Sequence, residues 1–283
     1  MENWTETCRG SVAPWECDVT EHFTIAYYFD RIGEAEAGLA AHLGLGELLG
    51  SGVFGRRFHV RFARELRAGD SFHIASAAIG TEGGLRLGHR IIDSTDGETV
   101  TWVEAVWDCA AAPILVERQD LIRRALVEWN GPPIEPRAEP NTAAGFIPTA
   151  RGRAGPADFD EHNRFSLAAF VHRFTTASLQ SQAAMGMTAH YMQDNRRGFS
   201  TFELVLQIEA TPGLGQPYLV ETGISHLGGS SVRFAHWMSD PLSGQRFARM
   251  GQFGVQLDLD ARRPARLPDQ LRARAEQLVV ATG

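Results

Sequence analysis

The chain has 283 residues, of which 43% are hydrophobic and 22% charged, a composition typical of a globular protein with one large core or two ordinary ones. Lysine and arginine number 27 and aspartate and glutamate 34, so the formal net charge is −7. This acidic balance argues against a general nucleic-acid binder, which needs a strongly basic surface. The sequence has no apolar run long enough to cross a bilayer and no signal-peptide pattern, so we expect a cytoplasmic protein that neither enters nor crosses a membrane.

The cysteines and histidines give no metal-binding or redox pattern. Cys8, Cys17 and Cys109 are odd in number and lack C-x-x-C spacing, so we expect reduced thiols. The ten histidines show no H-E-x-x-H or comparable ligand spacing. We therefore expect neither a metal nor a cofactor.

The predicted elements run in the same order in both halves of the chain. Apolar residues recur at helical spacing over residues 25–43, and a second helix is predicted over 165–185. In the first half, strand-like runs separated by Gly- and Asp-containing turns follow the helix. Each half is predicted to close with a short amphipathic helix, so a unit is one long helix followed by an antiparallel sheet. The strand-like runs are 58–62, 71–75, 85–92 and 99–107, and the closing helices are 119–129 and 269–279.

Short matches indicate that the two halves are copies of each other. Three segments of the first half recur in the second in the same order, and their offset grows along the chain, as a duplication with loop growth would produce. A stretch rich in Pro, Gly and Ala separates the copies, and its prolines disfavour helix and interior strand. We therefore predict an N-terminal domain at 1–129, a linker at 130–156 and a C-terminal domain at 157–283. The matched segments are 18–22 with 158–162 (offset 140), 43–45 with 185–187 (142) and 89–97 with 236–244 (147).

Three motifs of the first half resemble those of a known fold family. The motif Trp15-Glu-Cys-Asp18-Val-Thr-Glu-His22-Phe23 precedes the predicted helix, Tyr27-Tyr28-Phe29 lies on it, and Arg64-Glu65-Leu-Arg67-Ala-Gly69-Asp70 leads into the sheet. A unit of this kind resembles the hotdog-fold acyl thioesterases, in particular the hydroxybenzoyl-CoA-thioesterase-like and acyl-carrier-protein-thioesterase-like branches. The resemblance implies an α+β fold with two tandem hotdog domains, each a long central helix wrapped by an antiparallel sheet. Hotdog units of this family pair side by side, so a tandem copy supplies the pair in one chain, and we also expect a homodimer of the whole chain.

The resemblance implies hydrolysis of an acyl-CoA or acyl-carrier-protein thioester to free acid and thiol. It gives Asp18 the role of activating water or attacking the carbonyl carbon, and it gives His22 the role of holding that carboxylate or the substrate. Donors at the start of the helix would face the thioester oxygen. The candidate substrate-binding residues are Thr20, Tyr27, Tyr28 and Arg64.

The second copy departs further from the family pattern than the first. Its matching residues, Asp158 and His162, are therefore the candidates for a vestigial site. In the first copy, Thr20 stands where many relatives carry Asn.

Other interpretations of these residues stay open. Asp18 could be a plain helix N-cap, and His22 a packed structural histidine. His89 and His236 occupy equivalent strand positions, which favours a shared structural hydrogen bond over catalysis. At the level of function, the alternatives are a hotdog hydratase or dehydratase of enoyl or 3-hydroxyacyl thioesters, and a non-catalytic acyl-CoA-binding module.

Overall fold

We describe the computed structural model of the chain over residues 4–18, 20–50, 55–108 and 117–283. The chain divides into two compact units. Unit 1 comprises Met1–Ile134 and Asp158–Ala169, and unit 2 comprises Glu135–Ala157 and Phe170–Gly283. In each copy of the repeat the elements follow the same order: a strand, a single turn of 3-10 helix, a long helix and four further strands.

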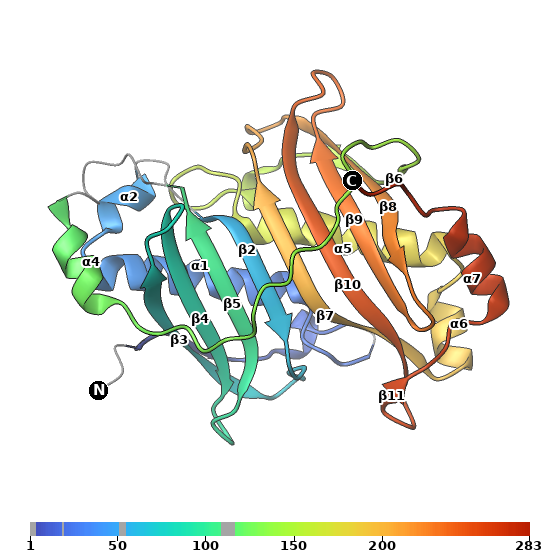
Figure 1. The fold of residues 1–283 in the computed structure, drawn as a ribbon, viewed down its shortest axis with the longest axis horizontal. Coiled ribbons are helices and arrows are strands. Elements are labelled where there is room, and N and C mark those ends of the chain that lie inside the picture. The colour runs from blue at the N-terminus through green and yellow to red at the C-terminus, as the bar shows by residue number, and fades with distance from the viewer. Residues whose placement is uncertain (1–3, 19, 51–54, 109–116) are drawn as a thin grey trace. The chain divides into compact units, whose positions relative to one another are not determined.

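The first copy builds an antiparallel sheet with the strand order β1-β3-β4-β5-β2 (Figure 1). Its first strand precedes the long helix α1 in the sequence and pairs with β3, at the sheet edge. The elements are β1 (Thr5–Ser11), η1 (Pro14–Glu16), α1 (Ile25–His42), α2 (Gly46–Gly50), β2 (Gly55–Phe62), β3 (Ser71–Gly80), β4 (Leu85–Asp93), β5 (Thr99–Trp107) and α4 (Gln119–Ala125).

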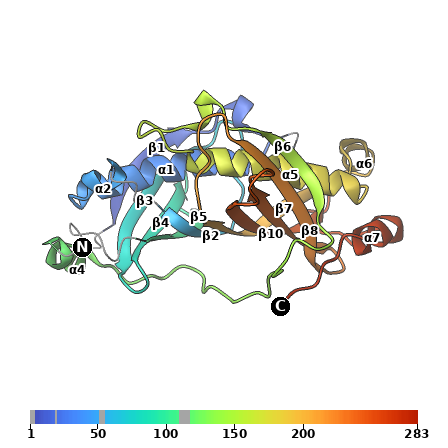
Figure 2. The same ribbon diagram turned by 90° about the horizontal axis from the view of Figure 1, so that it is seen from above.

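Helix α1 lies along one face of this sheet (Figure 2). Its apolar stripe, which includes Phe29, Ile32 and Leu39, is at most 1% exposed, and the Phe29 ring meets Phe58 of β2 edge-on at 5.9 Å. Each buried side chain of this size contributes about 1.5–3 kcal/mol by leaving water. The helix ends where Gly44 adopts a φ of +67°, the left-handed conformation that favours glycine after a helix C-terminus.

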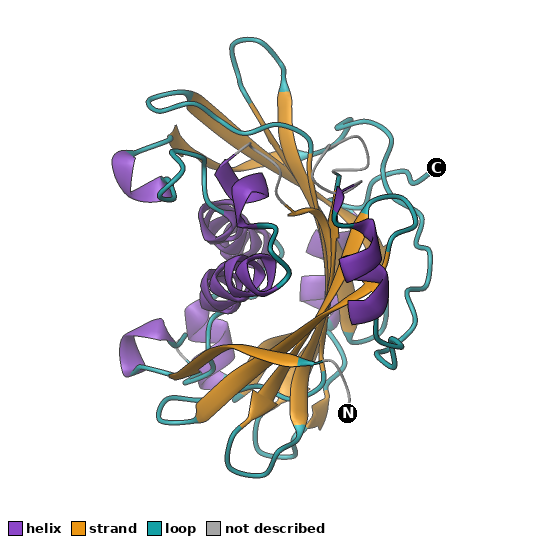
Figure 3. Cartoon of the chain, turned by 90° about the vertical axis from the view of Figure 1, so that its left-hand side faces the viewer, coloured by secondary structure: helices purple, strands orange, loops and turns teal. Residues whose placement is uncertain are grey.

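The second copy repeats this plan with the strand order β7-β10-β9-β8-β6. The ring centroid of Phe174, on its long helix α5, lies 6.0 Å from that of His236 on β9. Figure 3 shows the long helices and the strands by secondary structure. The elements are β6 (Ile147–Arg153), η2 (Pro156–Asp158), α5 (Leu167–Ala184), α6 (Ala189–Asp194), β7 (Arg197–Ile208), β8 (Pro217–Leu227), β9 (Ser231–Ser239), β10 (Arg246–Asp258), β11 (Arg263–Pro264) and α7 (Asp269–Glu276).

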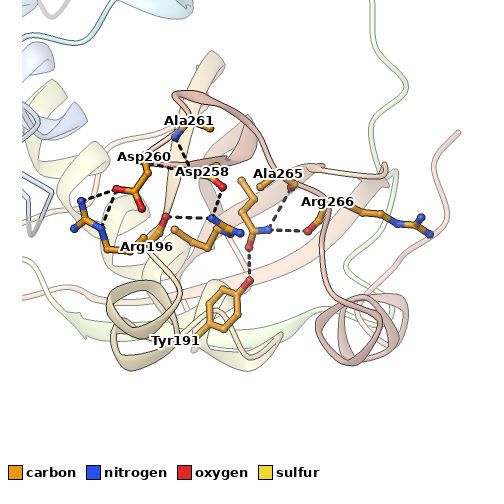
Figure 4. A network of polar contacts seen from close by, with 9 residues as sticks. Tyr191, Arg196, Asp258, Asp260, Ala261, Ala265 and Arg266 are labelled. Atoms are coloured by element: carbon orange, nitrogen blue, oxygen red, sulfur yellow. Dashed lines mark hydrogen bonds and ion pairs between the residues drawn. The ribbon is translucent and has the colours of Figure 1, made fainter.

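In unit 2, a network of hydrogen bonds and ion pairs holds the segment after β10 against its neighbours (Figure 4). Gln256 is fully buried, and its amide nitrogen donates to the carbonyl oxygens of Ala265 and Arg266 at 3.2 and 3.0 Å. The Tyr191 hydroxyl on α6 donates to the Gln256 amide oxygen at 2.8 Å. One buried side chain thus satisfies three polar partners and ties α6 to the segment that leads into α7.

A hydrogen-bonded chain of three polar side chains that ends at a buried histidine recurs in both copies. In the first copy, Thr7 meets Ser76 at 2.7 Å and Ser76 meets His89 Nδ1 at 2.7 Å. Both histidines of the repeat are fully buried, and burial lowers the pKa of each to about 3. The interpretation of His89 and His236 as holders of a shared structural hydrogen bond is confirmed. The second chain consists of Thr149, Thr222 and His236, with both links at 2.7 Å.

The predicted α+β fold with two tandem helix-and-sheet units is confirmed, and both long helices and the four strands of the first half lie where the sequence placed them. The structure also contains the strands β1 and β6, which the sequence did not predict. Strand β6 occupies residues 147–153, inside the stretch that the sequence assigned to the linker. The domain limits at 129 and 156 stay a prediction. Over the described ranges, no helix is both long and apolar enough to span a membrane.

Candidate active site

Asp18, Glu21 and His22 lie in a tight turn between η1 and α1. The backbone N–H of Asp18 donates to the carbonyl of His22 at 2.9 Å, and that of Glu21 donates to the carbonyl of Asp18 at 3.0 Å. Glu21 has a φ of +64°, which reverses the chain here. The N-cap of α1 is Thr24, so the alternative that Asp18 is a plain helix cap is wrong.

One carboxylate oxygen of Asp18 organises the turn. Asp18 Oδ1 accepts the backbone N–H of Thr20 at 2.7 Å, the hydroxyl of Thr20 at 2.7 Å and the backbone N–H of His22 at 3.2 Å. Thr20 Oγ1 also lies 2.8 Å from His22 Nδ1. Because the threonine proton goes to Asp18, the hydroxyl oxygen accepts from an Nδ1–H of His22. The structure therefore places Asp18, Thr20 and His22 in one hydrogen-bonded relay.

The second carboxylate oxygen of Asp18 differs from the first in its contacts. Within the part of the chain that the structure describes, no hydrogen bond reaches Asp18 Oδ2. The turn ends directly before α1, whose first N–H groups carry the positive end of the helix dipole. A carboxylate held by one oxygen, with the other free of hydrogen bonds in the described part of the chain, can serve as a general base or nucleophile for acyl transfer.

A loop after β2 completes the cluster around His22 with two residues that the sequence analysis did not choose. Arg67 Nη2 lies 2.9 Å from His22 Nε2, and Glu65 Oε2 lies 3.2 Å from the same nitrogen. The loop is fixed to the turn because the backbone N–H of Phe23 donates to the carbonyl of Leu66 at 2.8 Å. Both residues stand in the motif 64–70, but only the fold shows that they reach a histidine more than forty positions earlier.

Tyr28 supports this loop from inside the unit. It is 2% exposed, and its hydroxyl oxygen accepts the backbone N–H of Leu66 at 3.1 Å. Burial raises the pKa of Tyr28 above its ordinary value. Tyr28 was predicted to bind substrate, but the structure places its polar end on the backbone between Glu65 and Arg67.

The two other predicted substrate-binding residues lie in different surroundings. Tyr27 is half-buried, with its ring parallel to that of Phe23 at 6.3 Å. Arg64 donates to Asp93 at 3.0 Å and to Asp96 at 2.8 Å, so it is engaged by the turn after β4. The arginine that the structure brings to His22 is Arg67. A substrate-binding role for Tyr27 stays a prediction.

The same backbone turn recurs in the second copy, but two residues away from the predicted equivalents. The N–H of Asp160 donates to the carbonyl of Arg164 at 2.9 Å, that of Asn163 donates to the carbonyl of Asp160 at 2.9 Å, and Asn163 has a φ of +58°. Asp160 is therefore the counterpart of Asp18, and Arg164 that of His22.

This register corrects the predicted pair Asp158 and His162. The backbone N–H of Ser166 donates to the carbonyl of Asp158 at 2.7 Å, just as that of Thr24 donates to Glu16 at 2.9 Å, so Asp158 corresponds to Glu16. His162 takes the place of Thr20, because its backbone N–H donates to Asp160 Oδ1 at 2.9 Å.

The second turn holds an ion pair in place of the relay. Arg164 binds Asp160 Oδ2 through Nη2 at 2.8 Å and through Nε at 3.0 Å. The guanidinium stays charged and accepts no proton, so it cannot replace an imidazole in acid–base chemistry. The oxygen that corresponds to Asp18 Oδ2 is thus occupied.

A buried carboxyl group lies on α1. Glu36 is 7% exposed and accepts the indole N–H of Trp107 at 2.6 Å. Burial raises the pKa of Glu36 to about 7, against the opposing effects of Trp107 and of the Arg164 charge.

The described cysteines are poor nucleophiles, and the described residues form no metal-binding group. Burial and the Asp18 charge raise the pKa of the Cys17 thiol, which disfavours the nucleophilic thiolate. Burial, and to a smaller extent the contact with Glu34, raises the pKa of the Cys8 thiol to about 12. Cys109 lies outside the described residues. Among the residues that are described, no group of three His, Cys, Asp or Glu side chains could hold a metal ion.

Comparisons with known proteins agree with this architecture. Residues 154–275 match the family model of the thioesterase-like superfamily, whereas no curated protein matches the sequence. Three solved structures match almost end to end. A Lactobacillus plantarum protein described as an oleoyl thioesterase has 14% identity, a TM-score of 0.67 and coverage of 89% of this chain and 96% of its own.

The other two carry similar scores. An acyl-ACP thioesterase from Bacteroides thetaiotaomicron has 11% identity, a TM-score of 0.66 and coverage of 89% and 98%. The 12:0-ACP thioesterase from Umbellularia californica has 13% identity, a TM-score of 0.64 and coverage of 90% and 95%. At such identities the likeness establishes the fold, and it confirms the resemblance to the tandem hotdog thioesterases.

Proposed function

Starting from this thioesterase fold, we propose that the chain hydrolyses an acyl-CoA or acyl-carrier-protein thioester, with Asp18 as its catalytic carboxylate. The observation that carries the proposal is the relay of Asp18, Thr20 and His22, which fixes one oxygen of Asp18 and leaves the other, in the described part of the chain, without a hydrogen bond. The similar solved structures described as thioesterases of oleoyl and acyl-ACP substrates support the substrate class.

The proposed reaction follows from this geometry. Asp18 Oδ2 takes a proton from water, whose oxygen forms a bond to the thioester carbonyl carbon. Negative charge develops on the carbonyl oxygen, where the first N–H groups of α1 stabilise it. The carbon–sulfur bond then breaks, and the thiolate leaves and takes up a proton. Thr20 and His22 hold Asp18 in place throughout.

The first turn is the working site of the proposal. In the second turn Arg164 occupies the oxygen of Asp160 that would act as the base. As further parts of the proposal, the enzyme is cytoplasmic, acts without metal or cofactor and forms a homodimer.

The test compares wild type with Asp18→Asn and Asp160→Asn on a panel of aromatic, short-chain and long-chain acyl-CoA and acyl-carrier-protein thioesters. Free thiol release is followed. We expect release by wild type, a loss of about 100-fold in Asp18→Asn, and little change in the matched control Asp160→Asn.

Other outcomes would assign a different function. Thioesters that bind both wild type and Asp18→Asn equally and stay uncleaved would overturn the proposal in favour of a binding module. Hydration of an enoyl thioester without thiol release would establish the hydratase instead. Equal losses in Asp18→Asn and Asp160→Asn would refute the assignment of the first turn as the working site.

A further inference from the structure

The ring nitrogen His22 Nε2 has two oppositely charged neighbours. Arg67 Nη2 lies at 2.9 Å and satisfies the geometry of a hydrogen bond, whereas Glu65 Oε2 lies at 3.2 Å as an ion-pair partner if the ring is charged. Both come from the loop after β2. The neighbour on the His22 turn itself is Asp18, which is linked to the ring through Thr20.

The chemistry of arginine decides between the two partners. A guanidinium donates and never accepts, so its hydrogen bond requires a bare lone pair on Nε2. The ring is then neutral and carries its proton on Nδ1. This is the same form that Thr20 requires, because its own proton goes to Asp18 and its oxygen accepts from Nδ1. The two sides of the ring therefore agree.

We propose that Arg67 is a positioning residue of the site: by donating to His22 Nε2 it holds the ring as the neutral Nδ1–H form and so keeps the relay to Asp18 closed. The inference rests on the proposed function for its catalytic meaning. Its structural content, the state of one imidazole, does not depend on any activity.

Glu65 favours the opposite state. A protonated His22 would carry a hydrogen on Nε2, which repels Arg67 and is attracted by the Glu65 carboxylate. The loop thus presents one residue that holds the neutral ring and one that holds the charged ring. Its backbone is fixed by the Asp70 carboxylate, which accepts the N–H of Arg67 at 2.8 Å.

Arg64 supplies a matched control on the same loop. It is also an exposed arginine, but its guanidinium binds Asp93 and Asp96, at 3.0 and 2.8 Å, in place of the histidine. A general loss of positive charge from the loop would act similarly in both arginine variants. Loss of the specific hydrogen bond acts only in Arg67 variants.

The deciding experiment is long-range nitrogen–proton NMR of the His22 ring across a pH series from acid to mildly alkaline, in wild type and in the variants Arg67→Gln, Arg67→Lys and Arg64→Gln. We expect wild type to show the proton on Nδ1 at neutral pH. In Arg67→Gln the proton moves toward Nε2, because the guanidinium that requires a bare lone pair there is gone and Glu65 Oε2, at 3.2 Å, can accept an Nε2–H. Arg67→Lys retains the donor and restores the wild-type ring form, and Arg64→Gln leaves it unchanged.

Two results would overturn the inference: a wild-type ring that carries its proton on Nε2, or an Arg67→Gln ring that keeps its proton on Nδ1 as in wild type. Where wild type releases thiol, Arg67→Gln should release it more slowly and Arg67→Lys should recover the rate, because the relay to Asp18 depends on the Nδ1–H form of the ring. If wild type cleaves no thioester, the proposed function fails while the NMR result still decides the role of Arg67.

Discussion

Replacing Glu36 by Gln should change how the stability of the protein depends on pH. The carboxyl of Glu36 is buried on α1 and accepts a hydrogen bond from Trp107 at 2.6 Å. Burial raises its pKa from the ordinary value of 4.5 to about 7. Between these two values the folded chain holds a proton that the unfolded chain has released. The stability that this group contributes is therefore complete below pH 4.5 and is lost as the pH rises to 7.

The size of the effect follows from the same two values. A pKa difference of 7 against 4.5, at about 1.4 kcal/mol for each pH unit, corresponds to a loss of about 3 kcal/mol. A glutamine at this position has no proton to release, and its amide oxygen can still accept the indole N–H. We therefore expect the stability of the Glu36→Gln variant, relative to wild type, to rise by about 2–3 kcal/mol from about pH 5 to about pH 8.

Urea unfolding followed by circular dichroism, at steps of about one pH unit across this range, measures the difference. Taking the difference between variant and wild type cancels the titration of every other group. Glu34→Gln is the control, because Glu34 lies on the same helix with 58% of its side chain exposed beside Arg31. Its curve should run parallel to wild type. A Glu36→Gln curve that also runs parallel would refute the argument from burial.

Two further perturbations test the fold. His89→Asn should reduce the loss of stability in acid. The pKa of the buried His89 is about 3, so between pH 6.5 and 3 only the unfolded chain binds this proton. The stability that neutral His89 contributes is therefore lost as the pH falls, by about 2 kcal/mol from pH 6.5 to about pH 5. Urea unfolding at these two pH values measures the acid loss of stability in His89→Asn. The control is His73→Asn, because His73 is a half-buried histidine on β3. Equal acid losses in the two variants would contradict the prediction. Gly84→Ala should lower the free energy of unfolding by about 1–3 kcal/mol, because Gly84 has a φ of +128° and a Cβ would collide with the carbonyl oxygen of Trp107. A neutral result in denaturant unfolding, with Gly97→Ala at an open turn for comparison, would show that the turn can shift to make room.

In the first half, the sequence predicted the long helix and the strands that bury apolar side chains and missed the edge strand that does not. Helix α1 shows its stripe through Phe29, Ile32 and Leu39, all of which are buried. The strands β1 and β6 were missed because they lie at sheet edges and bury almost no apolar side chain. Their hydrogen bonds come from the neighbouring strands β3 and β8, and no alternation of apolar residues announces such a strand.

The register of the second turn was missed for a different reason. The letters of Asp-x-x-Glu-His match at an offset of 140, but the turn depends on an Asp that accepts backbone N–H groups and on a phenylalanine five residues later that closes it by a β-bridge. That spacing is shared by Asp18 with Phe23 and by Asp160 with Phe165, at the offset of 142 that the segments 43–45 and 185–187 also show. The contacts of Glu65 and Arg67 with His22 join segments distant in sequence, so only the fold reveals them.

Comparison of the two turns separates the structural work of the aspartate from its chemistry. In both copies Oδ1 accepts the backbone N–H groups that shape the turn, so an aspartate is needed here whether or not it reacts. The copies differ at Oδ2, which binds Arg164 in the second turn and has no hydrogen bond in the described part of the first. Asparagine retains the oxygen that builds the turn and removes the negative charge. Loss of thiol release in Asp18→Asn, with the turn intact, would therefore report on the second oxygen, whereas Asp18→Ala would confuse a broken turn with a missing base.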